Sequence, residues 1–175
     1  MAGVLDLFLF LFAFAIVGAG VISSRILGLA LTLVSWSSFA LSLKYGGSVD
    51  ARVGYMSILA WMLAMGDVLV CRMSGRKQLD LREFLVFSYV PPVVLLFLLN
   101  DHVYLGILGL VVLMILNDDS IAKKLPSSLF GRSTVLALLI FQIVLVGLLT
   151  RSPYVVPYAL VLWGWYKLEV ETLQK

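Results

Sequence analysis

Long apolar segments, separated by short polar connections, run through the whole 175-residue chain. The sequence is 62% hydrophobic and only 13% charged, whereas soluble domains contain about 45–50% apolar and about 25% charged residues. Apolar segments of this length and frequency indicate helices that cross a lipid bilayer. We therefore expect an all-α, polytopic protein that crosses the cell membrane several times.

Seven segments are expected to form helices. A spanning helix needs about 20 apolar residues, within a range of about 17–25. The first four segments and the sixth qualify, whereas the fifth and seventh are short enough to be re-entrant or half-spanning. With no internal repeat, low-complexity tract or soluble domain, the sequence predicts a single transmembrane domain, 1–175, built as a bundle of six to seven segments. The segments lie at 3–22, 26–43, 53–71, 84–99, 103–116, 134–150 and 154–168.

The basic residues predict the orientation of this bundle. If seven segments cross in alternation, ten of the thirteen lysines and arginines fall on one side. The positive-inside bias then puts the amino terminus outside and the carboxyl terminus in the cytoplasm. Basic cytoplasmic loops account for the net charge of +3. The charge therefore gives no indication of nucleic-acid binding, and we expect no nucleic-acid partner. The expected partners are the lipid bilayer and, within it, a substrate helix or partner subunits.

Residue types that bind cofactors are sparse in this sequence. The single cysteine, Cys71, has no second thiol or histidine near it with which to bind a metal. Paired intramembrane histidines, cysteine clusters and phosphate-binding glycine loops are all missing from the sequence. We therefore expect no cofactor and no metal.

The third segment carries a carboxyl group inside an apolar run, "LAMGDVLVCR", which contains Asp67. Small and polar residues recur around it at steps of three and four, as expected for a packed helix face with bulky side chains turned toward lipid or other apolar helices. The stripe comprises Ser57, Ala60, Ala64, Asp67, Cys71 and Ser74. Asp67 is therefore expected to point inward. An intramembrane carboxyl usually marks a functional site, and the alternative is a structural aspartate bonded to a neighbouring helix.

Two further segments carry polar or helix-breaking residues. The second segment holds four serines in "SWSSFALS", whose hydroxyls can bond to their own helix or to a neighbour. The fourth holds Pro91 and Pro92, whose missing amide donors favour a kink and free carbonyl groups. Contacts between helices explain both features; the alternatives are substrate contact for the serines and a cavity lined by the kink for the prolines.

Two short motifs match parts of a catalytic pattern. "AMGD" contains Gly66 and Asp67, and "VISSR", at the end of the first segment, contains Arg25. Together they resemble the archaeal preflagellin and prepilin peptidases, polytopic aspartyl proteases that act at the cytoplasmic side of the membrane. In that family the second catalytic aspartate lies in Gly-x-Gly-Asp, and the first opens an Asp-apolar-x-x-Arg pattern. Here Val21 stands where that first aspartate is expected.

The resemblance implies a site that contains Asp67, Gly66, Arg25 and Asp80. Aspartyl proteolysis needs two carboxyls that share a proton, and valine cannot be one of them. A working peptidase would therefore need Asp80 or Glu83, from the following loop, beside Asp67; otherwise the chain is a non-catalytic relative.

Two other functions are compatible with an intramembrane carboxyl. In a transporter or ion-conducting protein Asp67 would bind a cation or relay a proton. In a structural subunit of a larger energy-coupling membrane complex the helices would only pack. A second acid near Asp67 favours the peptidase, an aqueous cavity that reaches it favours transport, and burial by a neighbouring helix favours the structural role.

Overall fold

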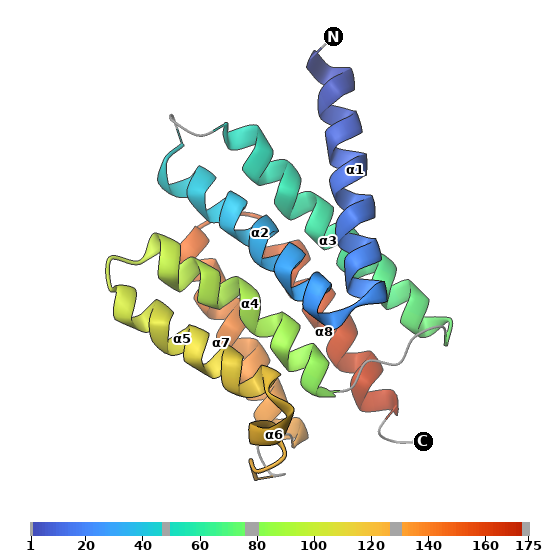
Figure 1. Cartoon of the computed structure of the whole chain (residues 1–175), viewed down its shortest axis with the longest axis vertical. Helices are drawn as coiled ribbons and strands as arrows, with labels where there is room; N and C mark the ends of the chain where they lie inside the picture. Colours follow the sequence, from blue (N-terminus) through green and yellow to red (C-terminus); the bar gives the residue numbers. More distant parts are fainter. Residues whose placement is uncertain (1, 47–49, 76–80, 127–130, 173–175) are drawn as a thin grey trace. The chain divides into compact units, whose positions relative to one another are not determined.

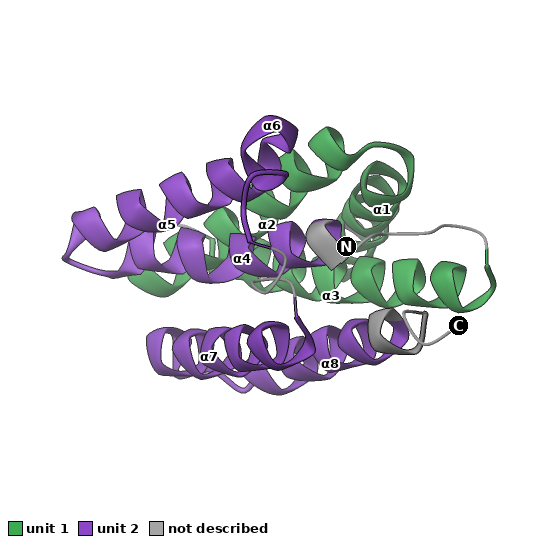
Figure 2. Cartoon of the chain, turned by 90° about the horizontal axis from the view of Figure 1, so that it is seen from below, with its two compact units in different colours: residues 1–77 green, residues 78–175 purple. Residues whose placement is uncertain are grey.

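The chain is helical throughout the part that the structure describes. The computed structural model describes residues 2–46, 50–75, 81–126 and 131–172, which form eight α-helices and no strand (Figure 1). The all-α fold expected from the sequence is confirmed. The helices group into two compact units, Met1–Lys77 and Gln78–Lys175, which Figure 2 distinguishes by colour. The single transmembrane domain stays a prediction.

Four helices among the described residues are long and apolar enough to cross a membrane. The spans are Asp6–Ser23, Arg25–Lys44, Ala51–Met73 and Arg132–Thr150. Two further apolar helices, Glu83–Leu99 and Val103–Asn117, are shorter. The fourth sequence segment lies within α4 (Leu81–Leu99), of which Glu83–Leu99 is counted among these shorter helices. These lengths are consistent with a membrane protein, and a total of six to seven spans stays a prediction.

Unit 1 contains three helices that contact one another: α1 (Ala2–Ser23), α2 (Arg25–Lys44) and α3 (Ala51–Met73). Ser24 alone separates α1 from α2, and its extended backbone and hydroxyl cap the first turn of α2. Asp50 caps α3, since its carboxylate accepts a hydrogen bond from the Arg52 amide at 3.0 Å. Because the chain reverses twice, α1 and α3 run in the same direction. Arg25 and the carboxyl end of α3 therefore lie at one end of the unit, and Asp50 lies at the other.

The interface between α2 and α3 is aromatic. The Trp61 indole donates a hydrogen bond to the Thr32 hydroxyl at 3.2 Å, and that hydroxyl donates to the Gly28 carbonyl at 2.7 Å. The Trp36 and Trp61 rings meet edge to face, with centroids 5.3 Å apart, a favourable geometry for aromatic pairs. A bulky side of α3 is therefore packed against protein together with its small residues.

Unit 2 is built around α4, whose two prolines lie inside the helix. α4 contacts α5, α7 and α8. Pro92 has no amide hydrogen, so the Ser88 carbonyl one turn earlier lacks its usual donor. The Tyr158 hydroxyl of α8 donates to that carbonyl at 3.3 Å. The helices of the unit are α4 (Leu81–Leu99), α5 (Val103–Asn117), α6 (Asp119–Ala122), α7 (Arg132–Thr150) and α8 (Val155–Thr172).

Candidate functional site

Helix α3 has two opposite faces in the structure. The buried face follows steps of four and three residues through Gly54, Ile58, Trp61, Met65 and Val68. We call the opposite side the outer face of α3, and it comprises Leu59, Leu63, Gly66, Asp67 and Val70. Apart from the half-buried Gly66, all of these residues are exposed.

Asp67 is exposed at the edge of this outer face, not turned inward as the small-residue spacing predicts. Ala60 and Ala64 are buried as expected. Asp67 follows the buried Ala60 by seven residues, and the two lie only about 20° apart around the helix axis. Rotation around the helix therefore does not account for the exposure of the carboxyl, which lies about 10 Å further along α3.

The four residues suggested by the peptidase resemblance are only partly described. Gly66 precedes Asp67 on α3, and a Cβ added to it would meet nothing within 4 Å. Arg25 begins α2, where its Nε and Nη2 atoms are buried without a hydrogen-bond partner in the structure. Asp80 lies outside the described residues. Val21, at the position of the family's first aspartate, is fully buried.

The described residues therefore bring no acid–base pair together around Asp67. No described residue forms a hydrogen bond or an ion pair with its carboxylate. No group of three or more histidine, cysteine, aspartate or glutamate side chains within the described ranges is placed to hold a metal ion. The catalytic assignment of Asp67, Gly66, Arg25 and Asp80 stays a prediction.

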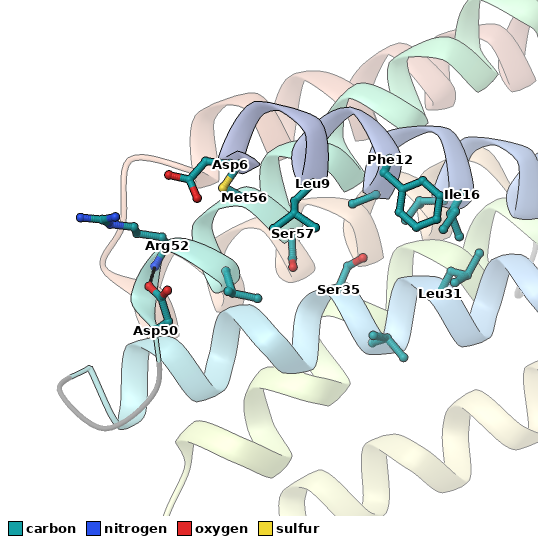
Figure 3. Close-up of a pocket in the computed structure, with 14 residues that line it drawn as sticks. Asp6, Leu9, Phe12, Ile16, Leu31, Ser35, Asp50, Arg52, Met56 and Ser57 are labelled. Carbon is teal, nitrogen blue, oxygen red and sulfur yellow. Dashed lines mark hydrogen bonds between the residues drawn. The ribbon is translucent and has the colours of Figure 1, made fainter. Parts of the chain in front are cut away.

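A cavity of about 510 Å³ opens between the three helices of unit 1 (Figure 3). It lies where α1 diverges from the other two helices of unit 1. Val17 and Val21 of α1 are buried, whereas Phe8 and Phe12, nearer its amino end, are more than half exposed. Apolar side chains, including Leu9, Phe12, Ile16 and Leu31, form most of its wall. Asp6, Asp50 and Arg52 lie together at one end, and the Ser35 and Ser57 hydroxyls face the interior.

A second cavity, of about 290 Å³, lies within unit 2 between α4, α5 and α7. Its lining is apolar except for Tyr89 and Gln142. Gln142 is 1% exposed, and neither atom of its side-chain amide has a hydrogen-bond partner in the structure. Tyr89 is near enough to interact with this amide but does not satisfy it.

The polar residues of the unit 1 cavity were not recognised from the sequence. In the sequence, Ser35 resembles the other serines of its segment, and Asp6 and Asp50 lie far apart along the chain. One signal was available. The first and third helices of an alternating bundle run in the same direction, so their amino ends, with Asp6 and Arg52, must meet on one side.

No protein-family model, curated protein or solved structure matches this chain. The outer face of α3 and the two cavities are therefore interpreted from their own chemistry. Asp67 without a second acid can form an ion pair or hydrogen bond but cannot carry out aspartyl proteolysis. The unit 1 cavity can hold an amphipathic molecule, because it combines a charged end with an apolar interior.

Proposed function

We propose that this chain is an integral membrane subunit that binds a partner protein inside the bilayer through the outer face of α3. The observation that carries the proposal is the exposure of the Asp67 carboxyl on an otherwise apolar face of a helix long enough to cross the membrane. Such a surface has one charged group and no described residue that pairs with it.

Energetics favour a protein partner over lipid at this face. A carboxylate at the bilayer centre costs about 2.5–3.5 kcal/mol on insertion scales. Asp67 precedes the last residue of α3, Met73, by about 9 Å along the helix axis, so its cost is smaller but still unfavourable. A partner helix with a lysine, arginine or several hydrogen-bond donors at this depth would offset it.

The shape of the outer face also supports helix docking. Leu59, Leu63, Gly66 and Val70 follow one another at steps of four, three and four residues, the spacing at which one helix packs along another. Gly66 has open space where a Cβ would stand, so a partner backbone can approach closely there. The apolar side chains would supply packing, and Asp67 would select a complementary partner.

The peptidase and transport functions have less support. Proteolysis needs a second acid beside Asp67, and no described residue of unit 1 supplies one; Asp80 lies outside the described residues, and Glu83 belongs to unit 2. Transport needs a route to Asp67, and this residue lines neither of the two cavities described above. The subunit function requires neither feature.

The proposal includes the topology predicted from the sequence. We infer a cell-membrane protein of six to seven spans, with the amino terminus outside and the carboxyl terminus in the cytoplasm. The ten basic residues on one side support this orientation. Asp67 would then lie toward the cytoplasmic side, since it is near the end of α3 that leads into the basic loop after Met73.

Site-specific photo-crosslinking in native membranes tests the proposal. A photoreactive amino acid replaces Leu63, and the control replaces Ile140 of α7, because both side chains are 52% exposed near the middle of a spanning-length helix. We expect Leu63 to give a discrete adduct with a second protein, which the additional Asp67→Leu change removes. The Ile140 control should give lipid adducts.

Three results would contradict the proposal. The first is a Leu63 probe that labels only lipid. The second is a cross-link from Leu63 to its own chain, because the outer face would then be covered internally. The third is an adduct that persists unchanged with Asp67→Leu, because the carboxyl would then make no contact with the partner.

A further inference from the structure

We propose that the unit 1 cavity binds one membrane phospholipid whose headgroup is zwitterionic and carries a primary amine, as in phosphatidylethanolamine. The inference concerns a different surface from the outer face of α3 and does not depend on the partner protein. It rests on the size of the cavity, on two hydroxyls inside it and on three charges at one end.

The length and the apolar wall of the cavity fit a lipid chain. Its apolar wall follows α1 from Asp6 to Ile16, about 15 Å along the helix axis. The cavity holds about 510 Å³. An extended hydrocarbon chain can lie along Leu9, Phe12 and Leu31 without displacing α1.

Two hydroxyls inside the cavity have no hydrogen-bond partner among the residues that the structure describes. On α2, Thr32, Ser38 and Ser42 each donate a hydrogen bond to a carbonyl of the preceding turn. Ser35 and Ser57 form no such bond with any described residue, and both hydroxyls point into the space between the helices (Figure 3). Ser35 is only 5% exposed.

An unsatisfied hydroxyl in an apolar site is unfavourable, so Ser35 and Ser57 indicate a ligand with polar atoms part-way along its length. The ester or ether oxygens between a lipid headgroup and its chains meet this requirement. These oxygens accept hydrogen bonds, and a serine hydroxyl can donate one.

The charges at the end of the cavity indicate the headgroup. Asp6, Asp50 and Arg52 form no ion pair with any described residue. Asp50 uses one carboxylate oxygen to accept from the Arg52 amide, and no described residue donates a hydrogen bond to its other oxygen. A zwitterionic headgroup matches this set, because its phosphate can pair with the guanidinium and its ammonium with the carboxylates. A purely anionic headgroup would meet two carboxylates and one arginine.

Native mass spectrometry of the whole chain in detergent tests the assignment. Phosphatidylethanolamine and phosphatidylglycerol with identical acyl chains are titrated separately, and their dissociation constants are compared. We expect phosphatidylethanolamine to bind about tenfold more tightly, because phosphatidylglycerol lacks the ammonium group that forms charge-assisted hydrogen bonds. Equal binding, or tighter binding of phosphatidylglycerol, would overturn the headgroup assignment.

Two substitutions locate the binding site. Ser57→Phe fills the interior and should abolish retention of phosphatidylethanolamine, whereas the control Ser74→Phe lies at the exposed end of the same helix. Arg52→Gln removes an exposed charge without altering the core and should weaken binding about tenfold. Its control, Lys44→Gln, removes an exposed charge at the same end of the unit. If Arg52→Gln and Lys44→Gln bind the lipid equally well, the cavity is not the site.

Discussion

A single methyl group added at Gly54 should destabilise unit 1. Gly54 is buried on α3 where this helix meets α2. A Cβ at this position would lie 2.8 Å from the Ser38 carbonyl oxygen and would overlap the Ser42 side chain. The Ser42 hydroxyl is held by a hydrogen bond of 2.7 Å to the Phe39 carbonyl, and a backbone oxygen cannot move without shifting α2. Gly54→Ala therefore forces the two helices apart.

The control variant is Gly66→Ala on the same helix, where the added Cβ meets nothing within 4 Å. Both variants gain the same intrinsic helix preference, about 1 kcal/mol for glycine to alanine. That contribution cancels when the two are compared, so the difference between them isolates the steric conflict. Overpacking of a well-packed core costs about 1–3 kcal/mol. Gly54→Ala should therefore be about 1–3 kcal/mol less stable than Gly66→Ala.

The assay is unfolding of the purified chain by sodium dodecyl sulfate in mixed micelles, followed by tryptophan fluorescence. Trp36 and Trp61 are both buried in unit 1, so their emission reports the separation of α2 and α3 once Trp163 and Trp165 of α8 are replaced by phenylalanine. Equal free energies of unfolding for the two variants would refute the close contact between these helices. Greater stability for Gly54→Ala would refute it as well.

Three further substitutions test individual buried groups with the same unfolding assay. Tyr158→Phe leaves the Ser88 carbonyl without its donor and should lower the free energy of unfolding by about 1–2 kcal/mol; an unchanged value would show that this hydrogen bond contributes nothing. Thr32→Val removes the acceptor of the Trp61 indole and should cost about 1–3 kcal/mol, whereas a stability equal to that of the parent chain would argue against the bond. Gln142→Met removes a buried amide that lacks a well-formed hydrogen bond and should raise stability by about 1 kcal/mol; a loss would mean that the amide is satisfied, by Tyr89 or by a bound molecule.

The positions of the helices could be predicted from the sequence because they depend on local composition. Six of the seven apolar segments lie wholly within a helix, and the seventh begins at Val155 instead of residue 154. Uninterrupted apolar runs favour helix over any other structure in a bilayer, since only a helix satisfies its backbone within one segment. The number of helices that cross the membrane does not follow from the same information.

The packed face of α3 could not be predicted in the same way. The small residues Ala60 and Ala64 correctly indicated a close contact. Trp61 is buried beside them because the Thr32 hydroxyl of another helix accepts its indole hydrogen, and no spacing rule within one segment reveals such a partner. With two neighbouring helices, α3 buries a wider face than its small residues define. Asp67 is nevertheless exposed near the carboxyl end of α3, although the buried Ala60 lies on the same side of the helix.

The unit 1 cavity also could not be predicted from the sequence, because it depends on contacts between different helices. Ser35 and Ser57 belong to different helices, and both resemble ordinary packing serines in the sequence. Their distinction is that they lack the bond to the preceding turn that Ser38 and Ser42 form. The divergence of α1, which creates the space they face, follows from the packing of the whole unit and not from any one segment.

The amount of partner protein that copurifies with Asp67→Leu, measured together with the stability of the isolated chain, is the decisive observation. If Asp67 contacts a partner within the bilayer, the Asp67→Leu variant loses that partner. The free energy of unfolding of the isolated variant should equal or exceed that of the parent chain, because a lipid-facing carboxyl has been removed. The control Asp101→Leu, at an exposed acid between α4 and α5, should retain the partner. A stable Asp67→Leu chain that copurifies with the same proteins in the same amounts would contradict the assignment of the outer face of α3 as a docking surface.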